Sequence, residues 1–231
     1  MRRGFPPRRL FTAAQPMFVY GLVADRAGNI YLFVTKGRDT RLVAIRPDGT
    51  LRYDIAFETT SRGDLAADQC TLIYTRRGGG AGRFDVCTAT PLEPIANVAA
   101  GVTLRILPDG GLLVSGDGLH RYDASGSLVR TIAVPPWVSN AVLALGENGR
   151  TALVGQFLDE LNSRVFEIDL DSGAVVRTVE LELNSISGIA AYRGWTAALG
   201  ALAPAPVPSL STYALIALGA MLAMFAVRRL T

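Results

Sequence analysis

The chain has 231 residues, with 23 lysines and arginines against 20 aspartates and glutamates, which gives a formal net charge of +3. Six arginines lie near the two ends of the chain: Arg2, Arg3, Arg8, Arg9, Arg228 and Arg229. Subtracting these six leaves 17 basic residues against 20 acidic ones, so the part between the ends is weakly acidic. Nucleic-acid binding requires a basic face on the folded domain, and the sequence therefore predicts no nucleic-acid partner.

Residues 1–16 (MRRGFPPRRLFTAAQP) form a basic, proline-containing segment that we predict to be disordered. A secretory signal peptide has a basic segment followed by about 7–15 apolar residues. Here the apolar stretch Leu10–Ala14 is short, and Pro16 follows it closely. Since the C-terminal segment described below indicates export, we expect a misplaced start codon, a truncated gene product or an unconventional export route.

Residues 17–200 repeat a pattern of apolar strand, polar turn and second apolar strand at intervals of about 40 residues. The five copies begin at Gly21, Asp64, Thr103, Val142 and Ile186. Each of the first four is followed by a second hairpin, whose strands alternate apolar and polar residues as half-buried strands do. Three of the second hairpins have turns of the residue types that tight turns require. These turns are Pro47-Asp48-Gly49, Ser125-Gly126 and Asp171-Ser172-Gly173.

Four strands in each repeat predict an all-β fold, namely a β-propeller of about four to five four-stranded blades. Residues 17–200 would contain four blades and the inner hairpin of a fifth, which ends near Leu199. Two alternatives remain open. The ring closes with five blades if residues 1–20 supply the missing strands, or it is incomplete and leaves a hydrophobic blade face that invites association. The turn-and-aromatic pattern resembles NHL-, YVTN- and SMP-30-like propeller repeats, most closely over residues 64–134.

Cys70 and Cys87 are the only cysteines, and both fall in the second predicted blade. We predict a disulfide between them, because an exported location permits oxidation. In the loop-entropy model, a bridge that closes about 17 residues stabilises the fold by about 3 kcal/mol. The alternative is a pair of buried thiols. A metal site needs more ligands than two cysteines, and the single histidine, His120, is not placed to help.

No group of residues in the sequence predicts a catalytic site. A Ser/His/Asp arrangement would need His120, which we expect on the exposed face of an outer strand. The resemblance to SMP-30-like lactonases implies one divalent cation, normally calcium, held by oxygen ligands from loops near the propeller axis. The weak candidates at such positions are Asp64, Asn140 and Asn184. Because no ligand motif of that family can be matched, we favour these residues as caps of strand ends and predict no cofactor.

The C-terminal segment predicts a membrane helix. Residues 201–209 form a proline- and alanine-rich spacer that favours an extended backbone. In residues 210–231, the run Tyr213–Val227 has no charged residue. A helix that also includes residues 210–212 is about 27 Å long, close to the roughly 30 Å of a bilayer core. Arg228 and Arg229 follow, and positive charge is retained on the cytoplasmic side, so the body would lie outside the cytoplasm. The alternative, a buried core helix, is disfavoured by the uniform apolar run.

This tail resembles the IPTL-CTERM protein-sorting domain, which is related in layout to PEP-CTERM signals. The resemblance rests on Val207-Pro208-Ser209-Leu210-Ser211, where the family has Ile-Pro-Thr-Leu-Ser, and on the apolar helix with its Arg-Arg end. Thr212 and Tyr213 stand where the family usually has Glu-Trp. The resemblance implies a Gram-negative bacterial surface protein whose tail is recognised, with or without cleavage, by an exosortase/archaeosortase-type sorting enzyme.

The sequence therefore predicts an exported protein of the cell envelope or cell surface, with a non-catalytic β-propeller that binds an unidentified surface ligand or acts as a scaffold. One alternative is a calcium-dependent SMP-30-like lactonase. The other is an N-terminally truncated gene product.

Overall fold

The computed structural model describes residues 18–36, 39–58, 62–76, 78–132, 142–157 and 163–181, together with Ile189 and Thr196. The chain divides into two compact units, Met1–Ala201 and Leu202–Thr231, and all of the described residues belong to the first. The predicted disordered segment 1–16, the spacer 201–209 and the membrane segment 210–231 lie outside the described residues. Within the described ranges, no helix is long and apolar enough to cross a membrane.

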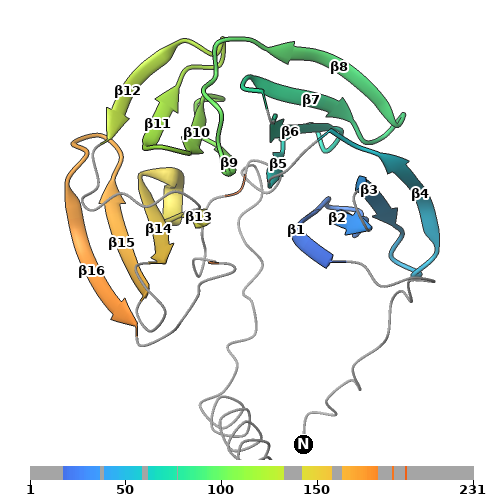
Figure 1. Ribbon diagram of the computed structural model, residues 1–231, viewed down its shortest axis with the longest axis horizontal. Helices are drawn as coiled ribbons and strands as arrows, with labels where there is room; N and C mark the ends of the chain where they lie inside the picture. Colours follow the sequence, from blue (N-terminus) through green and yellow to red (C-terminus); the bar gives the residue numbers. More distant parts are fainter. Residues whose placement is uncertain are drawn as a thin grey trace, which may run out of the picture. The chain divides into compact units, whose positions relative to one another are not determined.

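The described strands form four antiparallel sheets of four strands each, which are the blades of a β-propeller (Figure 1). Blade 1 consists of β1 (Phe18–Ala24), β2 (Ile30–Lys36), β3 (Asp39–Ile45) and β4 (Leu51–Ala56), and blade 2 of β5 (Gly63–Leu65), β6 (Thr71–Thr75), β7 (Ala81–Asp85) and β8 (Thr90–Ile95). Blade 3 consists of β9 (Thr103–Ile106), β10 (Leu112–Ser115), β11 (Leu119–Tyr122) and β12 (Leu128–Ile132), and blade 4 of β13 (Val142–Leu145), β14 (Thr151–Phe157), β15 (Ser163–Asp169) and β16 (Val175–Leu181). A short 3-10 turn, η1 (Glu147–Gly149), joins β13 to β14. The prediction of an all-β propeller is confirmed for these four blades.

Each blade is a meander, because the order of strands in the sheet follows their order in the chain. The blades follow one another around a common centre, with β1, β5, β9 and β13 innermost and β4, β8, β12 and β16 outermost (Figure 1). Side chains alternate between the two faces of each strand. In β15, for example, Phe166 and Ile168 are buried while Glu167 between them is half-buried. The period of two in the sequence therefore places one apolar row of β15 against the neighbouring blade 3.

The outer hairpins of blades 1, 3 and 4 are shaped by the glycines of the predicted turns. Gly49 and Gly126 both have φ of 87°, and Gly173 has φ of 77°, which is backbone that side chains with a Cβ avoid. Beside each glycine the strand register shifts by one residue, as in a hairpin with a bulge. The turn chemistry that the sequence predicts for these three hairpins is confirmed.

The hydrophobic core lies in layers between successive blades. Blades 1 and 2 share a layer that includes Tyr31, Phe33, Leu42, Leu65 and Leu72; blades 2 and 3 share Ile73, Leu104, Leu112 and Val114; blades 3 and 4 share Leu113, Leu119, Leu143, Val154 and Phe166. Full burial of one such side chain stabilises a fold by about 1.5–3 kcal/mol. Each blade is therefore stabilised mainly by its neighbours, which is the reason that propeller blades occur in series.

Contacts between inner strands join β1 to β5, β5 to β9 and β9 to β13. The described strands show no packing of comparable extent between blade 4 and blade 1. The predicted fifth hairpin, from Ile186 to near Leu199, lies outside the described residues apart from Ile189 and Thr196.

Candidate functional site

Asp64 is the one predicted calcium ligand within the described ranges, and it is a buried residue of the inner strand β5, only 5% exposed. Its Oδ2 accepts a hydrogen bond from the backbone N–H of Ile106 in β9 at 3.0 Å, and its Oδ1 accepts one from the N–H of Leu65 at 3.0 Å. Burial raises the pKa of the Asp64 carboxyl, although Arg105 nearby opposes this shift. The carboxylate thus joins the inner strands of blades 2 and 3.

Two arginines, Arg62 and Arg105, continue this connection between inner strands. Arg62 Nε donates to the carbonyl oxygen of Tyr20 in β1 at 2.7 Å, and Arg105 Nη1 of β9 donates to the carbonyl oxygen of Gly63 in β5 at 3.5 Å. Burial, with Arg105 as a second cause, lowers the pKa of Arg62. Calcium is held by several oxygen ligands, carboxylates among them. The Arg105 guanidinium near Asp64 is itself a cation, so it disfavours the binding of calcium at this carboxylate. The other two predicted ligands, Asn140 and Asn184, lie outside the described residues.

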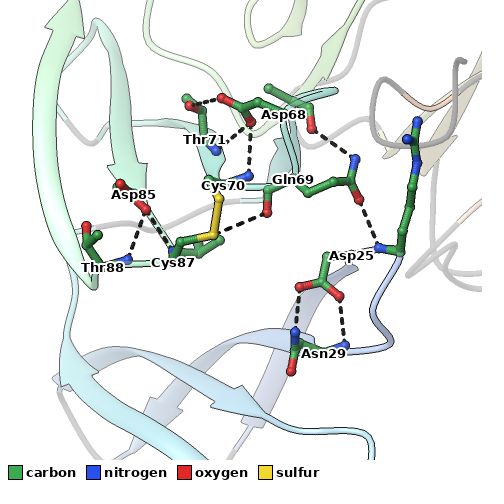
Figure 2. The surroundings of a disulfide bond; sticks show 12 residues. Asp25, Asn29, Asp68, Gln69, Cys70, Thr71, Asp85, Cys87 and Thr88 are labelled. Carbon is green, nitrogen blue, oxygen red and sulfur yellow. Dashed lines mark hydrogen bonds between the residues drawn. A yellow bond between two sulfur atoms is a disulfide. The ribbon is translucent and has the colours of Figure 1, made fainter.

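Cys70 and Cys87 form a disulfide with Sγ–Sγ of 2.03 Å and Cα–Cα of 5.2 Å, so the predicted bridge is confirmed. It links the turn before β6 to the turn between β7 and β8, at the same end of blade 2 (Figure 2). Each cysteine follows an aspartate by two residues. Asp68 Oδ1 accepts the N–H of Cys70 at 3.0 Å, and Asp85 Oδ1 accepts the N–H of Cys87 at 2.8 Å (Figure 2).

The two aspartates are held in place by threonines as well. Partial burial opposes ionisation of Asp68, but hydrogen bonds from the hydroxyl and N–H of Thr71 outweigh it and lower the pKa of Asp68. The N–H of Thr88 donates to Asp85 at 3.0 Å and is the main cause of the lowered pKa of Asp85. Short polar side chains that bond the following backbone favour turns. The disulfide therefore joins two turns that are each already ordered by a carboxylate.

Blade 1 packs directly on these disulfide-linked turns. Arg52 Nη2 donates to the carbonyl oxygen of Cys87 at 2.7 Å, and the hydroxyl of Tyr53 donates to the carbonyl oxygen of Val86 at 3.2 Å. At the inner turns, the N–H of Arg26 donates to Oε1 of Gln69 at 2.9 Å. The bridge in blade 2 consequently also orders the contact with blade 1.

Ligand atoms of Cys70, Asp85 and Cys87 lie within 4.8 Å of one another, which is the spacing of a metal site. Metal binding by cysteine needs the thiolate, and in this structure both sulfurs are bonded to each other. The arrangement is that of a covalent cross-link between turns.

His120 lies in β11 between two hydrogen-bonding side chains. Its Nε2 is 2.9 Å from Oδ1 of Asp117, and its Nδ1 is 3.1 Å from the hydroxyl of Thr131. The imidazole is 13% exposed, so the expectation of an exposed side chain was wrong; the contact with the neighbouring strand β12 covers it. Thr131, His120 and Asp117 provide a hydroxyl, an imidazole and a carboxylate in the order of a catalytic triad. Catalytic electrostatics depends on a site from which water is excluded. The Asp117 side chain is 88% exposed, so this arrangement does not meet that condition.

Residues 205–230 match the IPTL-CTERM motif. The match contains the predicted sorting motif Val207–Ser211 and the terminal pair Arg228 and Arg229, all of which lie outside the described residues. The motif implies processing by a sorting enzyme of the exosortase type. A comparison with curated proteins finds no significant match.

Solved structures with the same fold include a hydrazine synthase from Kuenenia stuttgartiensis (TM-score 0.56, 16% identity, covering 78% of this chain and 53% of that one). A mitotic checkpoint complex (0.53, 17%, 78% and 58%) and a protein of unknown function from Bacteroides caccae (0.51, 17%, 71% and 61%) are also similar. The chain thus spans little more than half the length of these proteins. At such identities the likeness shows the propeller fold alone.

Proposed function

We propose that this protein is an exported β-propeller held at the cell envelope by its C-terminal tail, and that the propeller serves as a non-catalytic binding or scaffold domain. The observation that carries the proposal is the coexistence in one chain of an IPTL-CTERM match at residues 205–230 and a disulfide-bonded propeller. Stable disulfides belong to oxidising compartments outside the cytoplasm, so the body and the tail indicate the same destination.

In this proposal, residues 210–231 span the membrane and Arg228 and Arg229 stay on the cytoplasmic side. The propeller is then outside the cytoplasm, and residues 201–209 separate it from the membrane. The sorting enzyme recognises Val207–Ser211, which lies at the outer boundary of the span.

The non-catalytic role is supported by how the polar side chains of the described blades are used. Asp64 bonds the backbone of the next blade, while Asp68 and Asp85 bond the turns around the disulfide. These carboxylates therefore act within the fold, and the surface of the propeller is the part available to a ligand.

The test is cell fractionation of the native host producing three forms of the chain. The full chain should appear in the envelope fraction with an oxidised Cys70–Cys87 pair. A chain that ends at Pro206 should leave the envelope fraction. Ser209→Thr, which restores the residue of the Ile-Pro-Thr-Leu-Ser pattern, is the matched control and should sort like the full chain. Envelope localisation of the chain that ends at Pro206 would refute the sorting role.

A further inference from the structure

The outermost strand of blade 4, β16, is longer and more exposed than the outermost strands of the other described blades. It has seven residues, of which Val175–Glu180 are exposed and Leu181 is half-buried. By comparison, β4 and β8 have six residues each, and β12 has five. Among the described strands, β16 has a neighbour, β15, on one side only. A strand at the edge of a sheet presents a row of N–H and C=O groups with which another chain can pair.

The other outer strands have features that oppose such pairing. β8 contains Pro91 and Pro94, which have no N–H to donate. β4 contains the charged residues Arg52 and Asp54, and all four residues from Arg52 to Ile55 are half-buried. β12 is the shortest of the four. Prolines, charges and short length are the means by which proteins protect the edges of their sheets, so β16 is the least protected edge among the described blades.

The two charged residues of β16 are both paired within blade 4. Arg177 Nη2 lies 3.0 Å from Oε2 of Glu167, and Glu180 Oε1 lies 2.6 Å from Nε of Arg164. Both partners belong to the neighbouring strand β15. Three exposed valines remain on β16, namely Val175, Val176 and Val179, at 41%, 61% and 40%. The charges of this strand are therefore held by its own sheet, and the valines are left in contact with solvent.

The sequence of β16 is compatible with antiparallel pairing to a second copy of itself. In a twofold pair with its axis perpendicular to the sheet, residues opposite one another share a face. An axis at Arg177 or at Glu180 would place like charges opposite each other, which destabilises a sheet. An axis at Thr178 pairs all seven residues: Thr178 with Thr178, Arg177 with Val179, Val176 with Glu180, and Val175 with Leu181. In this register no like charges are opposed, and threonine pairs and apolar pairs both stabilise a sheet.

We propose that β16 is the interface of a homodimer, in which the β16 strands of two copies pair antiparallel about an axis at Thr178. The occupant of this edge is a second copy of the chain, because the length and the charge pattern of β16 match those of the same strand reversed. The four strands of blade 4 and their four copies then form one continuous sheet. This inference adds an assembly to the fold and is independent of the proposed function in export.

Cysteine cross-linking of the purified full-length chain in detergent micelles tests this proposal. Thr178 is exposed, so Thr178→Cys leaves the core unchanged and places two thiols opposite each other at the axis. Residues directly opposite have Cβ atoms about 4.5–5.5 Å apart, close to the about 3.5–4.5 Å of a disulfide. Val129→Cys is the matched control, because Val129 is 57% exposed and also belongs to an outer strand, β12.

After air oxidation we expect a disulfide-linked dimer of the Thr178→Cys chain and at most a trace of dimer from the Val129→Cys chain. Peptide mapping by mass spectrometry should locate the new bridge between the two substituted positions. An intact Cys70–Cys87 bridge in the same samples verifies that each variant is folded and that no disulfide exchange has occurred.

Two substitutions of Val179 in the Thr178→Cys chain test the register. Val179→Lys places a second positive charge opposite Arg177 of the other copy, and should lower the initial rate of dimer formation by about threefold to tenfold. Val179→Glu places a negative charge opposite the same arginine and should not lower the rate. Because both variants replace a valine by a charged residue, their difference reports the sign of the charge across the interface.

The proposal is overturned if Thr178→Cys cross-links no faster than Val129→Cys, which would leave the edge of β16 to solvent or to a different protein. It is also overturned if the two Val179 variants form dimers at the same rate.

Discussion

The four inner strands occupy equivalent places in their blades, but β1 differs from the other three. Every residue of β5 and β13 is buried, and in β9 only Arg105 is not. In β1 only Val23 is buried, while Phe18, Val19 and Leu22 are 70%, 46% and 65% exposed. An inner strand is therefore buried by the blades on its two sides rather than by its own sequence, since the residues of β1 are as apolar as those of β13.

The largest expected effect breaks this comparison directly, by making the same substitution in a buried and an exposed inner strand. Leu65→Ala in β5 removes a side chain that is 1% exposed and should lower the free energy of unfolding by about 2–5 kcal/mol. Leu22→Ala in β1 is the matched control and should change it by about 0.5 kcal/mol or less. Urea denaturation of the two variants measures both values. Equal losses would mean that the exposure of Leu22 does not reflect its contribution to stability.

The second effect concerns the disulfide that fixes blade 2. Replacement of both Cys70 and Cys87 by alanine should lower the free energy of unfolding by about 3 kcal/mol, because the unfolded chain regains the freedom of the closed loop. The wild-type protein in reducing buffer is the control and should lose a similar amount. Denaturation curves for the three samples test this, and a reduced wild type as stable as the oxidised one would contradict it.

Asp64 gives a smaller effect that depends on pH. The raised pKa of this carboxyl means that the folded state binds its proton more tightly than the unfolded state. Asp64 therefore contributes stability below about pH 4, the ordinary pKa of aspartate, and this contribution is lost as the pH rises through the raised pKa. The amide of Asp64→Asn does not titrate, so in this variant the stability contributed at position 64 should not fall as the pH rises above about 4. It should also cost about 1–3 kcal/mol at neutral pH, because an amide cannot accept both backbone hydrogen bonds.

Denaturation midpoints measured between pH 4 and pH 7 test the effect of Asp64. Glu58→Gln, at a side chain that is 88% exposed, is the control and should leave the pH profile of the wild type unchanged. An identical pH profile for Asp64→Asn and the wild type would contradict the assignment of Asp64 as a group with a raised pKa.

The smallest expected effect lies at the turns, where the carboxylates titrate in the opposite sense. Hydrogen bonds from turn residues lower the pKa values of Asp48, Asp68, Asp85, Asp123 and Asp169. Their stabilisation is present above about pH 4 and is lost as the pH falls through the lowered values. The melting temperature should therefore fall on acidification below about pH 4. Asp123→Asn should show a smaller fall, and a melting temperature that rises in acid would contradict this account.

The features that the sequence predicted are those determined within one repeat. The spacing of the hairpins predicted the four blades, and the glycines of the turns predicted the tight turns of the outer hairpins. The two cysteines of blade 2 predicted the disulfide. The role of Asp64 was not predictable in the same way, because its partner Ile106 is 42 residues distant in the chain and belongs to another blade. The low exposure of His120 was missed for a different reason, because its partners lie in the same blade: Asp117 in the turn before β11 and Thr131 in β12. The contact with Thr131 depends on the register between β11 and β12, which the sequence pattern does not specify.

The hydrogen bonds between blades have one further consequence. Four of them join residues that are about one repeat apart: Arg26 to Gln69 at a separation of 43, Tyr20 to Arg62 at 42, Asp64 to Ile106 at 42, and Arg130 to Asp171 at 41. In such an array, stability is approximately a sum of nearest-neighbour couplings, and unfolding propagates along the series. A mechanical pull on the C-terminal end would accordingly detach the repeats one after another from that end. The covalent bridge in blade 2 then limits how far the chain can extend.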